Sequence, residues 1–184
     1  ILLEDHYKCW FLVSDLIGQV VKSSLWEPQL LSNREIQMRI PSILQWIEQA
    51  FMKPNKYLWG GSLGPDFDCS GLIQTAFAAQ SIWLPRDAYQ QELFCAPVSV
   101  SLNEIGNLLP GDLLFFGTNE HCKHVALYKG DYLYWHSSGI DNGRNGIGFD
   151  SLHSNAKSRV STFYRKQLRG AGRVDRCYDG KILF

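Results

Sequence analysis

The sequence has no excess of charge of either sign, since its 184 residues contain 18 basic and 18 acidic side chains. With no basic stripe or polybasic run, we expect it to bind neither nucleic acid nor a membrane surface. The apolar runs are too short to span a bilayer, and no charged start followed by an apolar stretch marks a signal peptide. The composition is ordinary for a globular protein, with 45% hydrophobic and 20% charged residues. The length allows one domain of usual size, or one such domain plus a small appendage.

The sequence also lacks the paired cysteines of a disulfide framework. Its five cysteines are odd in number and widely scattered. This pattern favours a reducing compartment, and we therefore expect a cytoplasmic protein. Most of the cysteines are expected to be small buried apolar residues, and only Cys69 has neighbours that suggest chemistry.

The order of predicted elements indicates an α+β fold in which helices precede an antiparallel sheet. Apolar periodicity predicts helices over residues 41–52, with Pro41 in the first turn, and over 69–79. A glycine-rich segment, YLWGGSLGPDFDCSG, lies between them. Strands are predicted at 113–116, 125–128, 132–135, 147–149 and 172–174, with an exposed loop over 138–148.

The part that precedes these elements has a different composition. Residues 1–26 are rich in strand-favouring types and are too short for a complete barrel. Residues 27–40 contain turn-forming residues and are interpreted as a linker, with a short helical stretch near 34–38. The main domain is predicted to span residues 41–184.

Cys69 is the strongest candidate for a nucleophile. It lies in Asp68-Cys69-Ser70-Gly71, between a glycine-rich turn and a predicted helix. The positive end of the helix dipole is expected to lower the pKa of the thiol and to populate the thiolate. Free backbone N–H groups at the helix start can stabilise an oxyanion. A cysteine simply buried at a helix start is the alternative.

A nucleophilic thiol needs a neighbouring base, and His124 and His136 lie on two strands of a predicted hairpin. A two-residue turn at 130–131 places the two imidazoles on opposite faces. A three-residue loop at 129–131 pairs them directly on one face, within reach of an imidazole–imidazole hydrogen bond. We predict the three-residue loop. Cys69 then attacks a carbonyl, His124 accepts the proton, and His136 orients His124, so that loss of His136 is the least damaging of the three.

Four blocks of the sequence, in this order, resemble the NlpC family of papain-like cell-wall peptidases: YLWGGSLGPDFDCSGLIQTAF, LPRDAYQQ, LLPGDLLFFG and HVALYKGDYLYWHSSG. The resemblance covers roughly residues 41–175. It implies a papain-like core, a triad of Cys69, His124 and His136, and no metal or organic cofactor. It also implies cleavage of the bond between γ-D-glutamate and a diamino acid in murein-derived peptides.

The first 26 residues resemble the end of the SH3-like domain found in one subgroup of this family. That subgroup acts on short wall peptides with a free N-terminal L-alanine and serves recycling. The resemblance implies that Tyr7 contacts substrate, that Asp68 and Ser70 hold the free amine, that Asp87 contributes nearby, and that the Tyr57 hydroxyl lies close to the nucleophile. From the residues alone, Asp68, Ser70 and Asp87 can equally be helix caps, and the two tyrosines packing aromatics. Arg86 could bind a substrate carboxylate in bidentate fashion, but a surface role is the expected one.

Three other functions remain open at this point. A papain-like amidase or acyltransferase would use the same triad on another substrate. A non-catalytic module would bind murein fragments without turnover. The residues His121, Cys122 and His124 are of metal-binding type at close spacing, so a metal-dependent hydrolase is the third alternative.

Overall fold

The computed structural model describes residues 12, 14, 17–18, 29–102 and 104–180. The predictions for the SH3-like segment at 1–26 and for Tyr7 concern positions almost all outside these residues. Within the described residues, no helix combines the length and the apolar character needed to cross a membrane.

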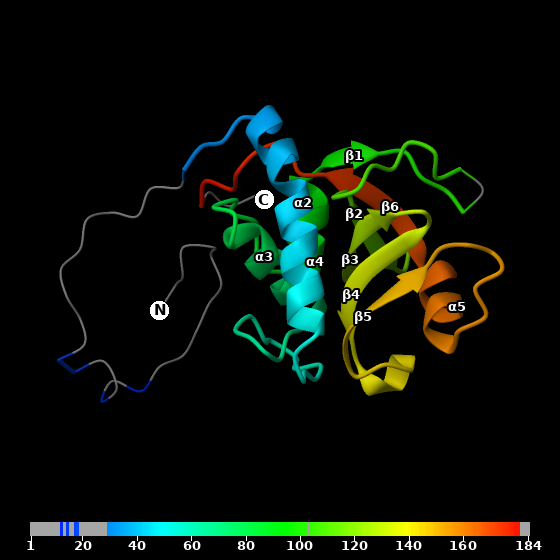
Figure 1. The fold of residues 1–184 in the computed structure, drawn as a ribbon, viewed down its shortest axis with the longest axis horizontal. Coiled ribbons are helices and arrows are strands. Elements are labelled where there is room, and N and C mark those ends of the chain that lie inside the picture. The colour runs from blue at the N-terminus through cyan, green and yellow to red at the C-terminus, as the bar shows by residue number, and fades with distance from the viewer. Residues whose placement is uncertain (1–11, 13, 15–16, 19–28, 103, 181–184) are drawn as a thin grey trace.

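The architecture is an antiparallel six-stranded sheet with helices on both faces (Figure 1), which confirms the predicted α+β class. Its strand order is β1-β6-β2-β3-β4-β5. The strands are β1 (Ala96–Val98), β2 (Leu113–Gly117), β3 (Cys122–Gly130), β4 (Leu133–Ser138), β5 (Gly146–Ser151) and β6 (Leu168–Arg173). Strand β1 was not predicted, because its three residues at the sheet edge give no alternating pattern.

The helices are α2 (Asn33–Phe51), α3 (Cys69–Ala78), α4 (Ala88–Phe94) and α5 (Arg159–Arg165), with a 3₁₀ turn at Ile140–Asn142. Helix α2 begins eight residues before the predicted start, inside the segment interpreted as a linker. Ser32 and Glu35 form a capping box there. A stripe of buried isoleucines continues through Pro41, and its burial outweighs the cost of about 3 kcal/mol for a proline inside a helix.

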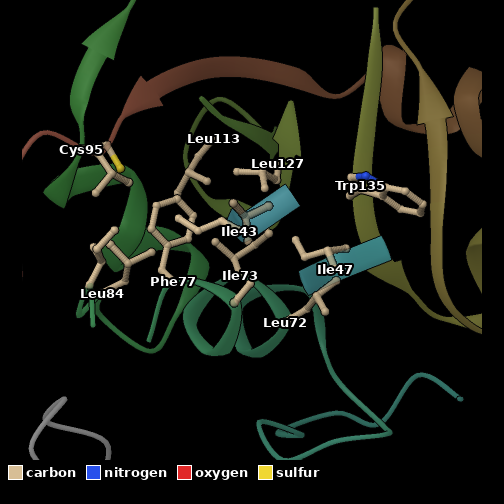
Figure 2. Close-up of a cluster of buried hydrophobic side chains, with 14 of the residues drawn as sticks. Ile43, Ile47, Leu72, Ile73, Phe77, Leu84, Cys95, Leu113, Leu127 and Trp135 are labelled. Atoms are coloured by element: carbon tan, nitrogen blue, oxygen red, sulfur yellow. The ribbon is translucent and has the colours of Figure 1, made fainter. Parts of the chain in front are cut away.

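Alternating strand residues divide the core into two layers. One layer joins α2 and α3 to one face of the sheet, and Figure 2 shows Ile43, Ile73 and Leu127 meeting there. The other layer lies beneath α5, where Phe116, Ala126, Tyr134 and Tyr164 are buried. His124 and His136 alternate with the first layer and therefore project toward α5, the helix on the right in Figure 1.

Candidate active site

Cys69 is the first residue of α3, as the sequence predicts. Asp68 is the N-cap, and its carboxylate accepts the Gly71 N–H at 2.6 Å and the Gly60 N–H at 2.9 Å. Gly71 has no room for a side chain, since a Cβ there would lie 2.1 Å from the Gly61 carbonyl oxygen. The glycine-rich turn is thus packed directly against the first turn of the helix that presents the thiol.

Arg86 corrects a prediction, because it is only 3% exposed rather than at the surface. Its guanidinium forms a bidentate pair with Asp68, at 3.1 Å to Oδ1 and 2.7 Å to Oδ2. It also donates to the Ser70 hydroxyl at 3.0 Å. Burial of the helix cap requires a partner for its charge, and Arg86 provides the fork geometry that a carboxylate accepts best.

The hairpin that carries the two histidines differs from the predicted one. Asp131 and Tyr132 have positive φ values of 50° and 65°, so β3 and β4 are joined by a two-residue turn between Gly130 and Leu133. The three-residue loop is therefore wrong. A bulge between Tyr128 and Gly130 then shifts the register by one residue.

That bulge decides which way the imidazoles point. Next to the turn, Gly130 pairs with Leu133, so the residue numbers of two paired positions add up to an odd number. Continued along the strands, this register would place His124 and His136 on opposite faces of the hairpin. Beyond the bulge, Tyr128 pairs with Tyr134, so the residue numbers of paired positions add up to an even number. In this register both histidine side chains project to the same side, as diagonal neighbours rather than as a direct pair. The predicted hydrogen bond is present, with His124 Nε2 at 2.9 Å from His136 Nδ1.

The chain of hydrogen bonds does not end at His136. Its Nε2 lies 3.0 Å from Oδ2 of Asp150, a residue of β5. His136 is fully buried, and Asp150 is nearly so. The sequence analysis missed Asp150, because only the pairing of β4 with β5 places it beside His136.

Asp150 is itself held from three directions. Ser158 and Ser161 donate to its Oδ1 at 3.1 Å and 2.8 Å, and the Arg144 guanidinium donates to its Oδ2. Burial raises the pKa of the Asp150 carboxyl, but the hydrogen bonds from His136 and Ser161 and the charge of Arg144 outweigh it and bring the pKa to about 2. The group is therefore a carboxylate at neutral pH.

Helix α5 supports this arrangement with one face. Ser158 is its N-cap, Ser161 follows three residues later, and Tyr164 three residues after that. The Tyr164 ring stacks on His124, with centroids 4.2 Å apart. Its hydroxyl lies 3.5 Å from His124 Nδ1 and bonds to Ser138 at 2.7 Å. In the sequence, the signal for this face is the S-x-x-S-x-x-Y spacing of Ser158, Ser161 and Tyr164.

Cys69 contacts the hairpin at the end where strands β3 and β4 are no longer paired. The ladder between β3 and β4 extends from the turn only as far as Leu127 and Trp135. In the gap, the Ser137 hydroxyl donates to the Phe67 carbonyl at 2.7 Å, and the Val125 backbone N–H donates toward the Cys69 sulfur. The start of α3 is thereby inserted beside the residue that follows His124.

The resting charge state differs from the prediction. Burial, with a smaller contribution from Asp68, raises the pKa of the Cys69 thiol to about 11. Burial also lowers the pKa of His124 well below its usual range, and His136 adds to this effect. The expected thiolate is thus not the resting form, because desolvation penalises the charged sulfur more than its backbone donors stabilise it. Thiol and imidazole are both neutral before substrate arrives.

The predicted substrate-contacting residues that the structure describes converge on one cleft of about 290 Å³. It is lined by Tyr57, Trp59, Gly60, Asp68, Cys69, Ser70, Asp87, Ala88, Tyr89, Cys122 and Lys123. Asp87 is the N-cap of α4, and its N–H donates to the Gln90 side chain at 3.0 Å. The cleft contains carboxylates, hydroxyls, a lysine and aromatic rings around the sulfur.

The metal-type cluster at 121–124 has a different geometry. Among the described residues, no three His, Cys, Asp or Glu side chains are grouped so that they could hold a metal ion. His124 bonds to His136, and the Cys122 thiol lies 3.6 Å from the His124 carbonyl oxygen. Cys69, Cys95, Cys122 and Cys177 are free thiols.

These observations define a papain-like fold, in which the helix that begins at Cys69 packs against the antiparallel strands that carry both imidazoles. Residues 54–169 match the model of the NlpC/P60 family, which is more than half of the chain. The chain belongs to the NlpC/P60 family of cell-wall peptidases, which confirms the resemblance.

Individual relatives agree with this assignment. The chain is 41% identical over 132 residues to the gamma-D-glutamyl-L-lysine dipeptidyl-peptidase of Bacillus subtilis, covering 70% of this chain and 38% of that protein. It is 34% identical over 110 residues to the murein DD-endopeptidase/LD-carboxypeptidase MepS of Escherichia coli, covering 59% and 53%. A crystal structure of an NlpC/P60 protein from Bacillus cereus has a TM-score of 0.57 at 26% identity, covering 73% of this chain and 39% of that one. The chain spans only 19% to 22% of the Listeria endopeptidases p60 that it matches.

Proposed function

We propose that this protein is a cysteine endopeptidase that hydrolyses the γ-D-glutamyl–L-diamino acid bond of short murein peptides with a free N-terminal L-alanine. The observation that carries the proposal is the position of Cys69 at the start of α3, next to the backbone of Val125, the residue that follows His124 in the hydrogen-bonded histidine pair. The name of the Bacillus subtilis relative supports the choice of bond. A role in peptide recycling would place the enzyme in the cytoplasm.

The first half of the reaction starts from a neutral pair. The Cys69 sulfur attacks the γ-carbonyl carbon of D-glutamate while its proton passes to Nδ1 of His124, since Nε2 of that ring is bonded to His136. The carbonyl oxygen becomes an oxyanion, and we expect a backbone N–H at the very start of α3 to stabilise it, since the N–H of Gly71 is already bonded to Asp68. Transfer of the proton within the attack avoids a free thiolate, which burial disfavours.

The second half restores the enzyme. The tetrahedral intermediate collapses, the carbon–nitrogen bond breaks, and His124 returns its proton to the leaving amine of the diamino acid. Water then attacks the thioester, with His124 accepting a proton from it and returning that proton to the Cys69 sulfur. One product is the peptide that ends in D-glutamate with a free γ-carboxylate, and the other is the diamino acid, or the peptide that begins with it. The reaction needs no external oxidant or cofactor.

Recognition of the free amine calls for an anionic partner in the cleft. Asp68 and Ser70 remain predicted contacts, but the Asp68 oxygens already accept from Arg86, Gly60 and Gly71. A carboxylate offers about four lone-pair positions, so little capacity remains at Asp68. We therefore expect Asp87 to supply most of the charge for the ammonium.

The test compares L-Ala-γ-D-Glu-L-Lys with its N-acetylated form, in the parent and in Cys69→Ala. The parent should cleave the free peptide, and Cys69→Ala should be slower by at least about 10³-fold. Cys122→Ala, a thiol in the same cleft, is the matched control and should retain activity. Equal rates on free and acetylated peptides would contradict the amine pocket while leaving the peptidase assignment intact.

The same substrates separate the alternative functions. Cleavage of a crosslinking D,D-bond instead of the γ-D-glutamyl bond would move this chain toward the activity named for the Escherichia coli relative. Thiol-dependent turnover of another amide alone would favour an amidase or acyltransferase. Tight binding of murein peptides without turnover would favour a binding module.

A further inference from the structure

We infer that Asp150 is a positioning residue that ends a four-member relay, Cys69–His124–His136–Asp150, by fixing the tautomers of both imidazoles and supplying the negative charge behind them. The inference rests on the proposed function, because it assigns Asp150 a part in the same proton transfer. It adds a carboxylate to the triad of Cys69, His124 and His136. It also gives α5 a role, because two serines of that helix bind the carboxylate.

The tautomers follow from the acceptor at the end of the chain. A carboxylate can only accept, so His136 must carry its proton on Nε2 to bond with Asp150 at 3.0 Å. Its Nδ1 is then an acceptor, and His124 must donate to it from Nε2 across 2.9 Å. Nδ1 of His124 is left unprotonated, with the Tyr164 hydroxyl 3.5 Å away, and an unprotonated Nδ1 is what a general base needs toward the thiol. One anion therefore sets the proton on two successive rings.

The carboxylate is fixed so that it can act in this way. Two hydroxyls from α5, those of Ser158 and Ser161, hold Oδ1. His136 and Arg144 share Oδ2. Rotation of the group would break bonds on both sides, and the rings cannot rearrange without leaving a buried donor without a partner.

Charge is the second contribution. Among the described residues, the titratable and charged groups around the imidazole pair are Tyr134 of β4, Asp150 of β5, Tyr164 of α5 and Arg144 in the loop before β5. Cys69 of α3 interacts with Tyr164. Burial raises the pKa of both phenols, so they remain neutral. Burial lowers the pKa of His136, whereas the bond and charge of Asp150 raise it and Arg144 lowers it. Asp150 therefore favours the imidazolium that forms during attack, and Arg144 opposes it.

This opposition gives a test that a purely structural role would not reproduce. In Asp150→Asn, the amide oxygen can take the Oδ2 position, where two donors converge, and its NH₂ can face the two serine hydroxyls, which also accept. The tautomers are then kept while the charge is lost. Arg144→Gln, at a partly exposed side chain, keeps the carboxylate and removes its counter-charge.

The matched control is Asp112→Asn, which breaks another buried carboxylate–arginine pair, with Arg173 at 2.7 Å. Asp112 precedes β2 near the turn end of the hairpin, where its backbone carbonyl accepts the Tyr128 N–H at 2.8 Å and its side chain accepts the Leu109 N–H. It reproduces the structural cost of losing such a pair without touching the relay. Thermal unfolding of all three variants establishes that each is folded.

Three measurements follow. Peptide cleavage by Asp150→Asn should lose kcat by about 10- to 100-fold with KM little changed, which is less than the about 10⁴-fold effect of a carboxylate bonded directly to the base. The acid limb of its kcat/KM profile should move to lower pH, and that of Arg144→Gln to higher pH. Asp112→Asn should move neither. Histidine ¹⁵N spectra of the parent should show both rings protonated on Nε2.

Iodoacetamide alkylation of Cys69, followed by mass spectrometry of its peptide, needs no substrate and separates the two proposals. Alkylation should slow in Asp150→Asn and quicken in Arg144→Gln, even if the parent cleaves none of the peptides and the proposed function fails. If the parent cleaves but Asp150→Asn matches Asp112→Asn in kinetics and alkylation, or if His136 carries its proton on Nδ1, the relay is refuted and the peptidase remains.

Discussion

The two halves of the site each bury an aspartate with an arginine, but they use the pair differently. At the start of α3, Asp68 faces Arg86, and both side chains are almost wholly buried. In the base half, Asp150 faces Arg144, which is partly exposed, and it also bonds to His136. The first pair cancels charge beside the thiol, whereas the second leaves charge to act on an imidazole.

The difference follows from what each half must hold. Burial already raises the pKa of the Cys69 thiol, Asp68 raises it further, and Arg86 lowers it. An unpaired Asp68 would thus hinder the loss of the thiol proton. The base half gains a proton during attack, and there a nearby anion helps. The two aspartate–arginine pairs therefore have opposite effects, since one limits negative charge near the thiol and the other provides it near the imidazoles. Variants that remove one member of either pair test this comparison.

The largest effect is expected from Arg86→Met, which leaves the Asp68 charge buried without its main partner. We expect a loss of about 3–5 kcal/mol in the free energy of unfolding, because an isolated buried charge is poorly compensated. Alkylation of Cys69 should also slow, since the charge that lowers its pKa is gone. Urea unfolding and thiol alkylation measure the two effects.

The control for this variant is Arg169→Met, which breaks the partly exposed pair of Arg169 with Glu92. Solvent screens that pair, so we expect a loss below about 1 kcal/mol. Equal losses in the two variants would show that burial does not distinguish the Asp68 pair from an ordinary surface one.

Sequence reasoning found the parts of the site that are local in the chain. Cys69 at a helix start follows from glycine-rich residues before an apolar periodic run, and the histidines follow from a hairpin. The contacts of Asp150 and Arg86 with the site could not be predicted, since Asp150 reaches His136 through strand pairing and Arg86 reaches Asp68 across 18 residues. Gly130 is a sequence signal for the bulge at Tyr128–Gly130, but the same glycine fits the predicted three-residue loop equally well, so the direction of both rings could not be read from it.

The pH dependence of stability should separate the halves from one another. His124 and His136 have lowered pKa values, so the unfolded chain binds more protons than the folded one as pH falls below about 6.5. Stability should therefore decline below that pH, by up to about 1.4 kcal/mol per pH unit for each ring. Asp150, with its pKa lowered to about 2, adds a further loss only below pH 3.8.

The thiol half should respond at the opposite end of the scale. Because the folded pKa of Cys69 is raised from 9.0 to about 11, the folded chain holds a proton that the unfolded chain releases, and stability should fall as pH rises through this interval. Urea unfolding at pH steps from 4 to 10 measures both limbs. A curve that is flat between pH 7 and 5 would contradict the neutral burial of the imidazoles.

The smallest effect is expected for Asp87→Asn, which tests how the cleft treats the substrate amine. Asparagine is as good a helix N-cap as aspartate, so stability should be unchanged. KM for L-Ala-γ-D-Glu-L-Lys should rise about 10-fold, equivalent to about 1.4 kcal/mol, while kcat stays near the parent value. Glu120→Gln makes the same charge change in a neighbouring hollow that does not include Cys69, and it should leave KM unaltered. If both variants raise KM equally, the contribution is the general charge of the cleft, and if neither does, recognition of the amine belongs to Asp68 despite its filled oxygens.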